Sequence, residues 1–299
     1  MRSAISIKNI VKKYKGFTLN ISDLHIPEGF ATALIGENGA GKSTLMNILS
    51  GVRLDYKGEM TFFEKYTDRD RENESCPVRE DIGYTAPNNY FIPSWSVDQV
   101  RRAGELLFDK FDGDKFNHVC TELGIVEKEG EKKKKVTEFS DGNKMKIMIA
   151  SALARETKML IMDEPASPLD PLMRDRLCEM IREYIEEGAG ERTVLFSTHN
   201  IADMENVTDY AIIMEHGQVI ELGFVEDLKE KYIMVKGEIA DVEIAEKALY
   251  SISKNKYGFE GICLAENVDQ LSGLDVILER PSLSQISVDI MKEYSKIAK

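Results

Sequence analysis

Residue types that suit phosphate chemistry stand close together near the start of the chain. An apolar run that ends at Ile35 leads into Gly-x4-Gly-Lys-Ser and then into a helix-like segment, residues 45–49. The glycines let the backbone curl so that several N–H groups and the next helix N-terminus face one anion. Lys42 can reach β- and γ-phosphates, Ser43 can offer a hydroxyl to Mg²⁺, and Thr44 adds a second hydroxyl. The pattern predicts nucleotide contacts along Gly36, Asn38, Gly39, Ala40, Gly41, Lys42, Ser43 and Thr44.

Two further apolar runs end in polar side chains. Asp163 and Glu164 follow residues 158–162, and His199 follows residues 193–198. Short apolar runs separated by helical segments predict a parallel sheet, in which ligands bind at the carboxyl ends of the strands. Asp163 can place an oxygen near Mg²⁺ there, while Glu164 can orient and deprotonate the water that attacks the γ-phosphorus. His199 can contact the γ-phosphate. Taken alone, the two carboxylates could instead cap the strand, and His199 could be structural.

A β layer is expected to precede the phosphate loop. Apolar residues alternate with polar ones between Ile5 and Ile26, which predicts short antiparallel strands, and residues 59–63 predict a further edge strand. Tyr14 lies at a turn among lysines. It is either an exposed turn residue or a ring that stacks on a base, an interaction that stabilises by about 1–3 kcal/mol.

Helical segments are expected between the two halves of the parallel sheet. Ser96 opens a capping-box sequence, and apolar residues then recur at helical spacing as far as Phe111. A second helix is expected between Asp114 and Gly124, and a third opens at residues 140–142. Lys132 begins a run of four lysines, which is either a solvated connector or a contact for anionic lipid head groups.

The chain divides into a nucleotide domain, residues 1–229, with a helical lobe at about 90–155, and a small mixed α/β module, residues 230–299. The first ends in a predicted strand, glycine turn and returning strand over residues 209–220. In the module we expect helices at residues 242–253 and 282–296 and strands at residues 261–265 and 276–278.

Composition limits the partners. The net charge is −13, with 39 Lys and Arg against 52 Asp and Glu. This excess argues against binding to nucleic acid, which depends on basic side chains.

The four cysteines form no Cys-x-x-Cys pair, as in a protein of the reducing cytosol. Because no apolar run reaches the length of a membrane helix, we expect a chain that neither spans a membrane nor is exported. Any membrane role must then come through a partner.

From Ile5 to about Leu228 these motifs, in this order, resemble the ATP-binding subunit of an ATP-binding-cassette (ABC) transporter. Residues 36–44 resemble its Walker A loop, residues 159–164 its Walker B strand, residues 167–170 its D-loop, and His199 its switch histidine. The resemblance implies a P-loop NTPase fold with a RecA-like parallel sheet, an antiparallel β subdomain and an inserted helical lobe. It also implies ATP and Mg²⁺ as cofactors.

The resemblance further implies partners. Two ATPase subunits, identical or different, would associate head to tail around two ATP molecules, with Ser140, Asp141 and Gly142 of one facing Lys42 and Glu164 of the other. Asp170 would belong to the D-loop, and Tyr14 would stack on adenine. An integral membrane permease would dock against residues 91–107, which would place the protein peripherally on the cytoplasmic face of the cell membrane.

Two positions depart from the family pattern. The signature reads Phe-Ser-Asp-Gly-Asn, so that Asp141 puts a carboxylate where the family has glycine. We expect Asp141 to cap the following helix; the alternative is that it faces the phosphates and repels them. Pro87 stands where the family has a metal-sensing glutamine, and Asn88 is the expected substitute as a metal ligand.

These departures and the closing residues 279–284 resemble the ATPases of small bacterial exporters of antibiotics, peptides and lipids. We therefore expect a subunit that powers export through a separate permease. A soluble regulatory ABC-type ATPase is the alternative. It predicts long coiled-coil insertions or two cassettes in the chain, and the sequence shows neither.

Overall fold

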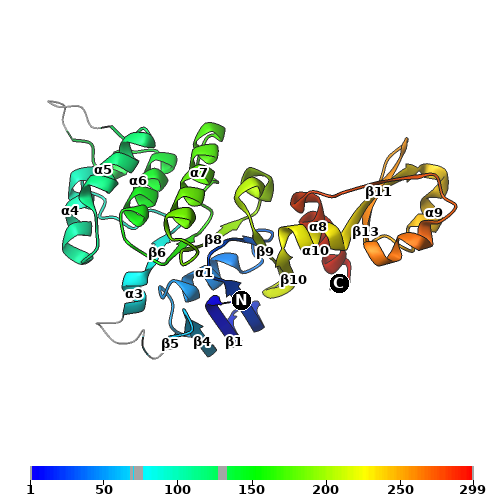
Figure 1. Ribbon diagram of the computed structural model, residues 1–299, viewed down its shortest axis with the longest axis horizontal. Helices are drawn as coiled ribbons and strands as arrows, with labels where there is room; N and C mark the ends of the chain where they lie inside the picture. The colour runs from blue at the N-terminus through cyan, green and yellow to red at the C-terminus, as the bar shows by residue number, and fades with distance from the viewer. Residues whose placement is uncertain (1, 68–69, 71–76, 127–132, 298–299) are drawn as a thin grey trace.

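Three sheets organise the part of the chain that the computed structural model describes, residues 2–67, 70, 77–126 and 133–297 (Figure 1). Cys76 and Lys132, both noted in the sequence, lie outside these ranges. The helical lobe lies at one end of the molecule and the C-terminal module at the other, with the central sheet between them. The α/β fold predicted from the motifs is confirmed.

The central sheet has the strand order β10-β9-β3-β8-β7-β6. All neighbouring strands are parallel except the pair β9 and β10. The bounds are β3 Ala31–Ile35, β6 Ile82–Thr85, β7 Met159–Met162, β8 Thr193–Thr198, β9 Tyr210–Glu215 and β10 Gln218–Phe224. The predicted strand, glycine turn and returning strand over residues 209–220 are therefore present as β9, the turn at Gly217, and β10.

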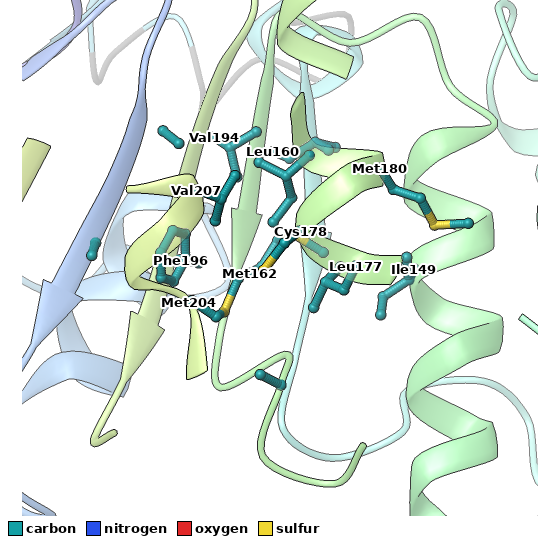
Figure 2. Packing of buried hydrophobic residues seen from close by; sticks show 14 of the residues in the cluster. Ile149, Leu160, Met162, Leu177, Cys178, Met180, Val194, Phe196, Met204 and Val207 are labelled. Atoms are coloured by element: carbon teal, nitrogen blue, oxygen red, sulfur yellow. The ribbon is translucent and has the colours of Figure 1, made fainter. Parts of the chain in front are cut away.

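The strands β3, β7, β8, β9 and β10 each supply two cores, because successive side chains point to opposite faces. In β7, Leu160 and Met162 join the core that contains the helical lobe, while Met159 and Ile161 join the core beneath the N-terminal sheet. Figure 2 shows the first of these cores between β7, β8 and the helix α7, Pro171–Glu187. The two apolar cores thus cover both faces of the central sheet. The polar residues predicted for the site lie at the ends of its strands.

The N-terminal sheet is antiparallel, as predicted, with the order β2-β1-β4-β5. Its strands are β1 Ser3–Tyr14, β2 Phe17–Pro27, β4 Lys57–Phe62 and β5 Tyr66–Thr67. The strand predicted over residues 59–63 is present as β4, but its expected place at the edge of the sheet was wrong, because the two-residue strand β5 pairs along the outer side of β4.

The helical lobe contains α4 Val97–Leu107, α5 Gly113–Glu122, η1 Val136–Glu138 and α6 Asp141–Leu153, and the short α3, Pro77–Asp81, precedes β6. The capping box at Ser96 is confirmed: Gln99 N donates to Ser96 Oγ at 3.3 Å, and Ser96 N donates to the Gln99 side chain at 2.9 Å. Phe111 lies beyond the end of α4, so its expected place in that helix was wrong. Asp112, not Asp114, caps α5, since its carboxylate accepts two backbone N–H groups.

Beyond β8, the short helices η2 Ile201–Asp203 and η3 Glu205–Val207 lead to β9. The C-terminal segment then forms an antiparallel sheet of order β12-β13-β11-β14. Its elements are α8 Val225–Lys231, β11 Tyr232–Glu238, η4 Ile239–Asp241, α9 Val242–Ala245, β12 Ser251–Lys254, β13 Gly258–Leu264, η5 Ala265–Leu271, β14 Val276–Glu279 and α10 Leu283–Ile297. The strands predicted over residues 261–265 and 276–278 are present as β13 and β14, and the last helix agrees with the prediction, whereas β11 and β12 were not predicted. The helix expected over residues 242–253 was wrong, because α9 ends at Ala245 and residue 251 begins a strand.

The last helix returns to the nucleotide domain. Leu283, Ile286 and Ile290 of α10 belong to the same buried core as Ala31 and Phe196 of the central sheet. The rest of the C-terminal sheet has a small core of its own around Val235 and Phe259. Within the described ranges, no helix has both the length and the apolar character needed to cross a membrane.

Candidate nucleotide-binding site

The phosphate loop joins a fully buried strand to a helix, as the sequence pattern requires. It runs from Gly36 to Gly41, between β3 and α1, Lys42–Leu49. Gly39 and Gly41 have φ values of 93° and 106°, in the left-handed region that side chains disfavour. A Cβ on Gly36 would lie 2.5 Å from the carbonyl oxygen of Met214, so the loop also packs tightly on β9. No side chain caps α1, and its first N–H groups stay directed at the loop.

Lys42 is held inside this loop. Its residue is almost fully buried, and its Nζ donates to the carbonyl oxygens of Gly36 at 2.7 Å and Glu37 at 3.2 Å. The same Nζ lies 3.5 Å from Oε1 of Glu164. A buried ammonium held by two carbonyl oxygens and the Glu164 carboxylate can exchange these partners for phosphate oxygens. The geometry therefore suits the predicted contact of Lys42 with a nucleotide.

Asp163 is buried where β7 ends, beside the hydroxyls of Ser43 and Ser197. Ser197 Oγ donates to Oδ1 of Asp163, while Oδ2 has no hydrogen-bond partner. Burial is the main cause that raises the pKa of Asp163, and the hydrogen bonds from Ser197 and Ser43 oppose it. An unpartnered buried carboxylate oxygen beside a serine hydroxyl fits a Mg²⁺ ion, which prefers oxygen ligands.

Binding of the metal ion would depend on the phosphates of a bound nucleotide. No cluster of three His, Cys, Asp or Glu side chains suited to a metal occurs in the described part of the chain. Mg²⁺ typically binds through one or two protein oxygens together with substrate phosphates. Ser43 and Asp163 match such a site, and they are the residues that would hold the ion.

Glu164 and His199 face each other across the ends of β7 and β8. His199 Nδ1 lies 2.8 Å from Oε2 of Glu164. Glu164 has φ 51°, which is uncommon for a residue with a side chain, and its N–H donates to Ser197 Oγ at 2.9 Å. The backbone turn thus points the Asp163 carboxylate inward and leaves the Glu164 carboxylate at the cavity surface.

A cavity of about 1150 Å³ brings the predicted residues together. Predicted site residues in its lining are Tyr14, Asn38, Gly39, Gly41, Lys42, Ser43, Thr44, Asn88, Asp141, Glu164 and His199. Gly36 and Asp163 lie behind this surface, in the buried layer that supports it. Ala40 is also buried, and its carbonyl oxygen accepts the N–H of Gly217 at 2.9 Å.

Two aromatic side chains line the cavity. Tyr14 is partly exposed, with Lys12 Nζ 5.3 Å and Arg53 Cζ 5.6 Å from its ring centroid. Phe17, which the sequence analysis did not single out, lines the cavity as well, and its ring lies 6.3 Å from that of Tyr14. Tyr14 thus presents a partly exposed ring at the cavity.

The expectation that Asp141 caps α6 was wrong. Ser140 is the N-cap, since its extended backbone lets its Oγ accept the N–H of Asn143 at 3.3 Å. Asp141 is the first helical residue. Its side chain is 88% exposed and pairs with Lys144 at 2.9 Å. Both side chains line the cavity, so a carboxylate and its compensating ammonium stand where the signature begins.

The signature and the D-loop are in direct contact. A Cβ on Gly142 would lie 2.6 Å from the carbonyl oxygen of Pro168. Asp170 caps α7, since its Oδ1 accepts the N–H of Met173 at 3.1 Å. Ser167 and Pro168 line the cavity, whereas Asp170 is absent from its lining. Asn88 lies at the cavity surface, and its role as a metal ligand stays a prediction.

Ser197 and Lys144 are site residues that sequence reasoning missed. The β7–β8 register places Met162 opposite Phe196, which brings Ser197 level with Asp163. A polar residue within the apolar run 193–198 was the available signal for Ser197. Lys144 follows Asp141 by three residues on one helix, a spacing at which opposite charges meet.

Comparison with known proteins gives the family. A profile of the ABC transporter family matches residues 19–167. The uncharacterized ABC transporter ATP-binding protein YxlF of Bacillus subtilis is 32% identical over 234 residues, which cover 76% of this chain and 73% of YxlF. The chain belongs to the family of ABC transporter ATP-binding proteins.

Two other similarities concern the length of the relatives and the fold. The chain spans about 15% of the human ATP-binding cassette sub-family A member 10, with 29% identity over 240 residues, or 77% of this chain. The solved structure of an ATP-binding subunit of an ABC transporter superposes with a TM-score of 0.64 at 25% identity, covering 76% of this chain and 92% of that one. Further relatives are named as a methionine import ATP-binding protein and an L-cystine transport system ATP-binding protein.

Proposed function

We propose that this ABC ATPase hydrolyses ATP to drive a separate membrane permease, and that it does so as a dimer with a second ATPase subunit. The observation that carries the proposal is the convergence of Lys42, Glu164 and His199 on one cavity, with Asp163 buried directly behind its surface. Transporter names among the relatives support the coupling to a permease. In this arrangement the protein would sit peripherally on the cytoplasmic face of the membrane.

Each residue has a distinct part in the proposed reaction. Lys42 and the N–H groups of α1 would bind the β- and γ-phosphates of ATP. Asp163 and Ser43 would hold Mg²⁺, which supplies charge neutralisation at the phosphates. Glu164 would accept a proton from the attacking water, and His199, at 2.8 Å from Glu164, would fix the orientation of that carboxylate.

The second subunit would complete the site. Ser140 and Gly142 lie at the start of α6, and Gly142 packs against the carbonyl of Pro168 in the same chain. We propose that this surface faces the phosphate loop of the other subunit. Tyr14 would stack on the adenine, and Asn88 would replace the missing glutamine near the metal.

The helical lobe would receive the permease. Leu106 and Leu107 at the end of α4 are 86% and 67% exposed, and Ile92 is 49% exposed. Leu106 and Leu107 are adjacent in the chain, and adjacent exposed apolar side chains favour a protein contact. Export of an antimicrobial, peptide or lipid-like substrate is the direction we propose, on the resemblance of the signature and of residues 82–89 to small exporters.

Purification of the native complex from membranes tests the proposal. A polytopic membrane protein should copurify with the parent chain, and copurification should fall when Leu107→Asp is introduced. Tyr257→Asp, at an exposed position in the C-terminal module, is the matched control. Recovery of the ATPase in the soluble fraction without a membrane protein would favour the alternative, a regulatory ABC-type ATPase that is not coupled to transport.

A further inference from the structure

The outer edge of β14 is open. In the described part of the chain β14 is the last strand of the C-terminal sheet and pairs with β11. Ile277 and Leu278, at its centre, are 64% and 47% exposed. As neighbours in a strand, they point to opposite faces of the sheet. Both faces are therefore apolar at this edge, which is a template for pairing with another strand.

The charges that flank β14 are arranged for pairing with an identical strand. Asp275 and Arg280, both exposed, lie two residues outside Ile277 and Leu278. In an antiparallel pair centred between Ile277 and Leu278, Asp275 of each copy would lie opposite Arg280 of the other. Two-fold symmetry forms this contact twice, because residue i meets residue j and j meets i. Opposite charges placed directly across two strands stabilise the pair.

The other edge of the same sheet lacks this complementarity. β12 is also an edge strand, and the equivalent pairing of two copies would place Ser251 opposite Lys254 and Tyr250 opposite Asn255. No acidic residue would meet Lys254. Lysine on an edge strand disfavours pairing with other chains. The comparison singles out β14.

We propose that β14 pairs with β14 of a second copy of this chain, which extends the C-terminal sheet across two copies. Every residue that lines the nucleotide cavity precedes Asn200 in the chain, whereas the proposed contact lies at residues 275–280. The contact therefore needs no nucleotide. It would hold two copies at high local concentration when ATP is absent, so that closure around ATP becomes an event within one assembly.

Sedimentation velocity of the full chain without nucleotide tests the proposal. The parent protein should show a concentration-dependent dimer. Asp275→Arg replaces two attractive contacts with two repulsive ones and should weaken the dimer about tenfold or more. The double variant Asp275→Arg/Arg280→Asp restores complementarity and should recover the dimer. Arg280 also pairs with Glu226 at 2.7 Å, but both side chains are more than half exposed, so the fold depends little on that pair.

Two further variants make the result decisive. Glu266→Arg makes the same charge change in η5, outside β14, and should leave the dimer as in the parent. Ile277→Lys, which places a charge at the centre of the edge, should abolish it. A monomeric parent protein, an unchanged dimer in Asp275→Arg, or a double variant as weak as the single one would each overturn the proposal. Because nucleotide is omitted, none of these results bears on ATP hydrolysis.

Discussion

The hydroxyl of Ser197 accepts the backbone N–H of Glu164 at 2.9 Å and donates to the carboxylate of Asp163. One side chain on β8 thus positions two residues at the end of β7, the one expected to hold the metal and the one expected to activate water. It also supports Glu164 in its uncommon backbone conformation, φ 51°.

Ser197→Ala should therefore reduce turnover more than ATP affinity. Without this hydroxyl, the Glu164 N–H loses its acceptor and the buried Asp163 carboxylate loses a donor, which costs about 1–3 kcal/mol. We expect kcat to fall at least tenfold while the Kd for ATP changes little. Ser151→Ala, at another buried serine, is the control and should keep the parent kcat. Equal losses in the two variants would show that Ser197 acts only through packing.

Glu164→Gln should bind ATP but hydrolyse it slowly. Loss of a general base typically costs about 10²–10⁴-fold in rate, and glutamine keeps the size and the backbone of the residue. Single-turnover hydrolysis and equilibrium ATP binding measure the two effects separately. Unaltered turnover would falsify the assignment of Glu164 as the base.

Lys42→Ala should weaken ATP binding itself. Its buried Nζ is held within the loop, and backbone amides cannot replace its full charge at the β- and γ-phosphates. Isothermal titration with ATP should show a large loss of affinity, and the melting temperature of the nucleotide-free variant serves as the control for folding. An affinity within about twofold of the parent value is incompatible with the proposed role.

The two residues at the start of α6 should respond differently to substitution. Ser140→Ala removes the N-cap and should destabilise the fold by about 1 kcal/mol, seen as a lower melting temperature. Asp141→Asn removes an exposed charge from the cavity that is expected to face triphosphate. It should raise ATPase activity only several-fold, because Lys144 and solvent already reduce the repulsion between this carboxylate and the triphosphate. The melting temperature should change little. A melting temperature that falls in Asp141→Asn as much as in Ser140→Ala would argue against this assignment.

Glu215 provides a test that depends on pH. This residue at the end of β9 is 4% exposed, its Oε2 has no hydrogen-bond partner, and burial raises the pKa of its carboxyl group. The folded state therefore binds the proton more tightly than the unfolded state does. The ionised group costs stability above the raised pKa, and this cost disappears as pH falls below the ordinary carboxyl pKa of about 4.3.

Glu215→Gln should accordingly raise the melting temperature at pH 7 and lose most of this advantage near about pH 4. Melting curves of the nucleotide-free proteins at several pH values provide the measurement. An advantage that is the same at both pH values would mean that packing, not ionisation, is responsible.

Local sequence patterns predict most of the nucleotide site because its residues stand at the ends of apolar strands. The phosphate loop, Asp163 with Glu164, and His199 each follow a run whose composition indicates burial, and parallel strands bring these ends to one edge. Ser197 was missed because its contact depends on the register between β7 and β8. Ser140 and Asp141 are both residue types that favour an N-cap, so only the observed start of α6 distinguishes them.

The C-terminal module was harder to predict for a related reason. Residues 242–253 contain apolar spacings compatible with a helix, but pairing with β13 makes residues 251–254 a strand. Such pairing is a tertiary effect that overrides local preference. The packing of α10 into the nucleotide core likewise joins residues more than 250 positions apart, as in the pair Ala31 and Ile286.

The position of α10 has a consequence for synthesis on the ribosome. Tyr294 donates to the side chain of Gln218, and its ring lies 6.4 Å from that of His216, in the turn whose Gly217 supports Ala40 of the phosphate loop. The loop, residues 36–41, is translated long before α10, so its support from α10 arrives only late in synthesis. The nucleotide domain therefore reaches its complete core only after the C-terminal segment leaves the exit tunnel, and a nascent chain stalled before residue 283 would lack part of it.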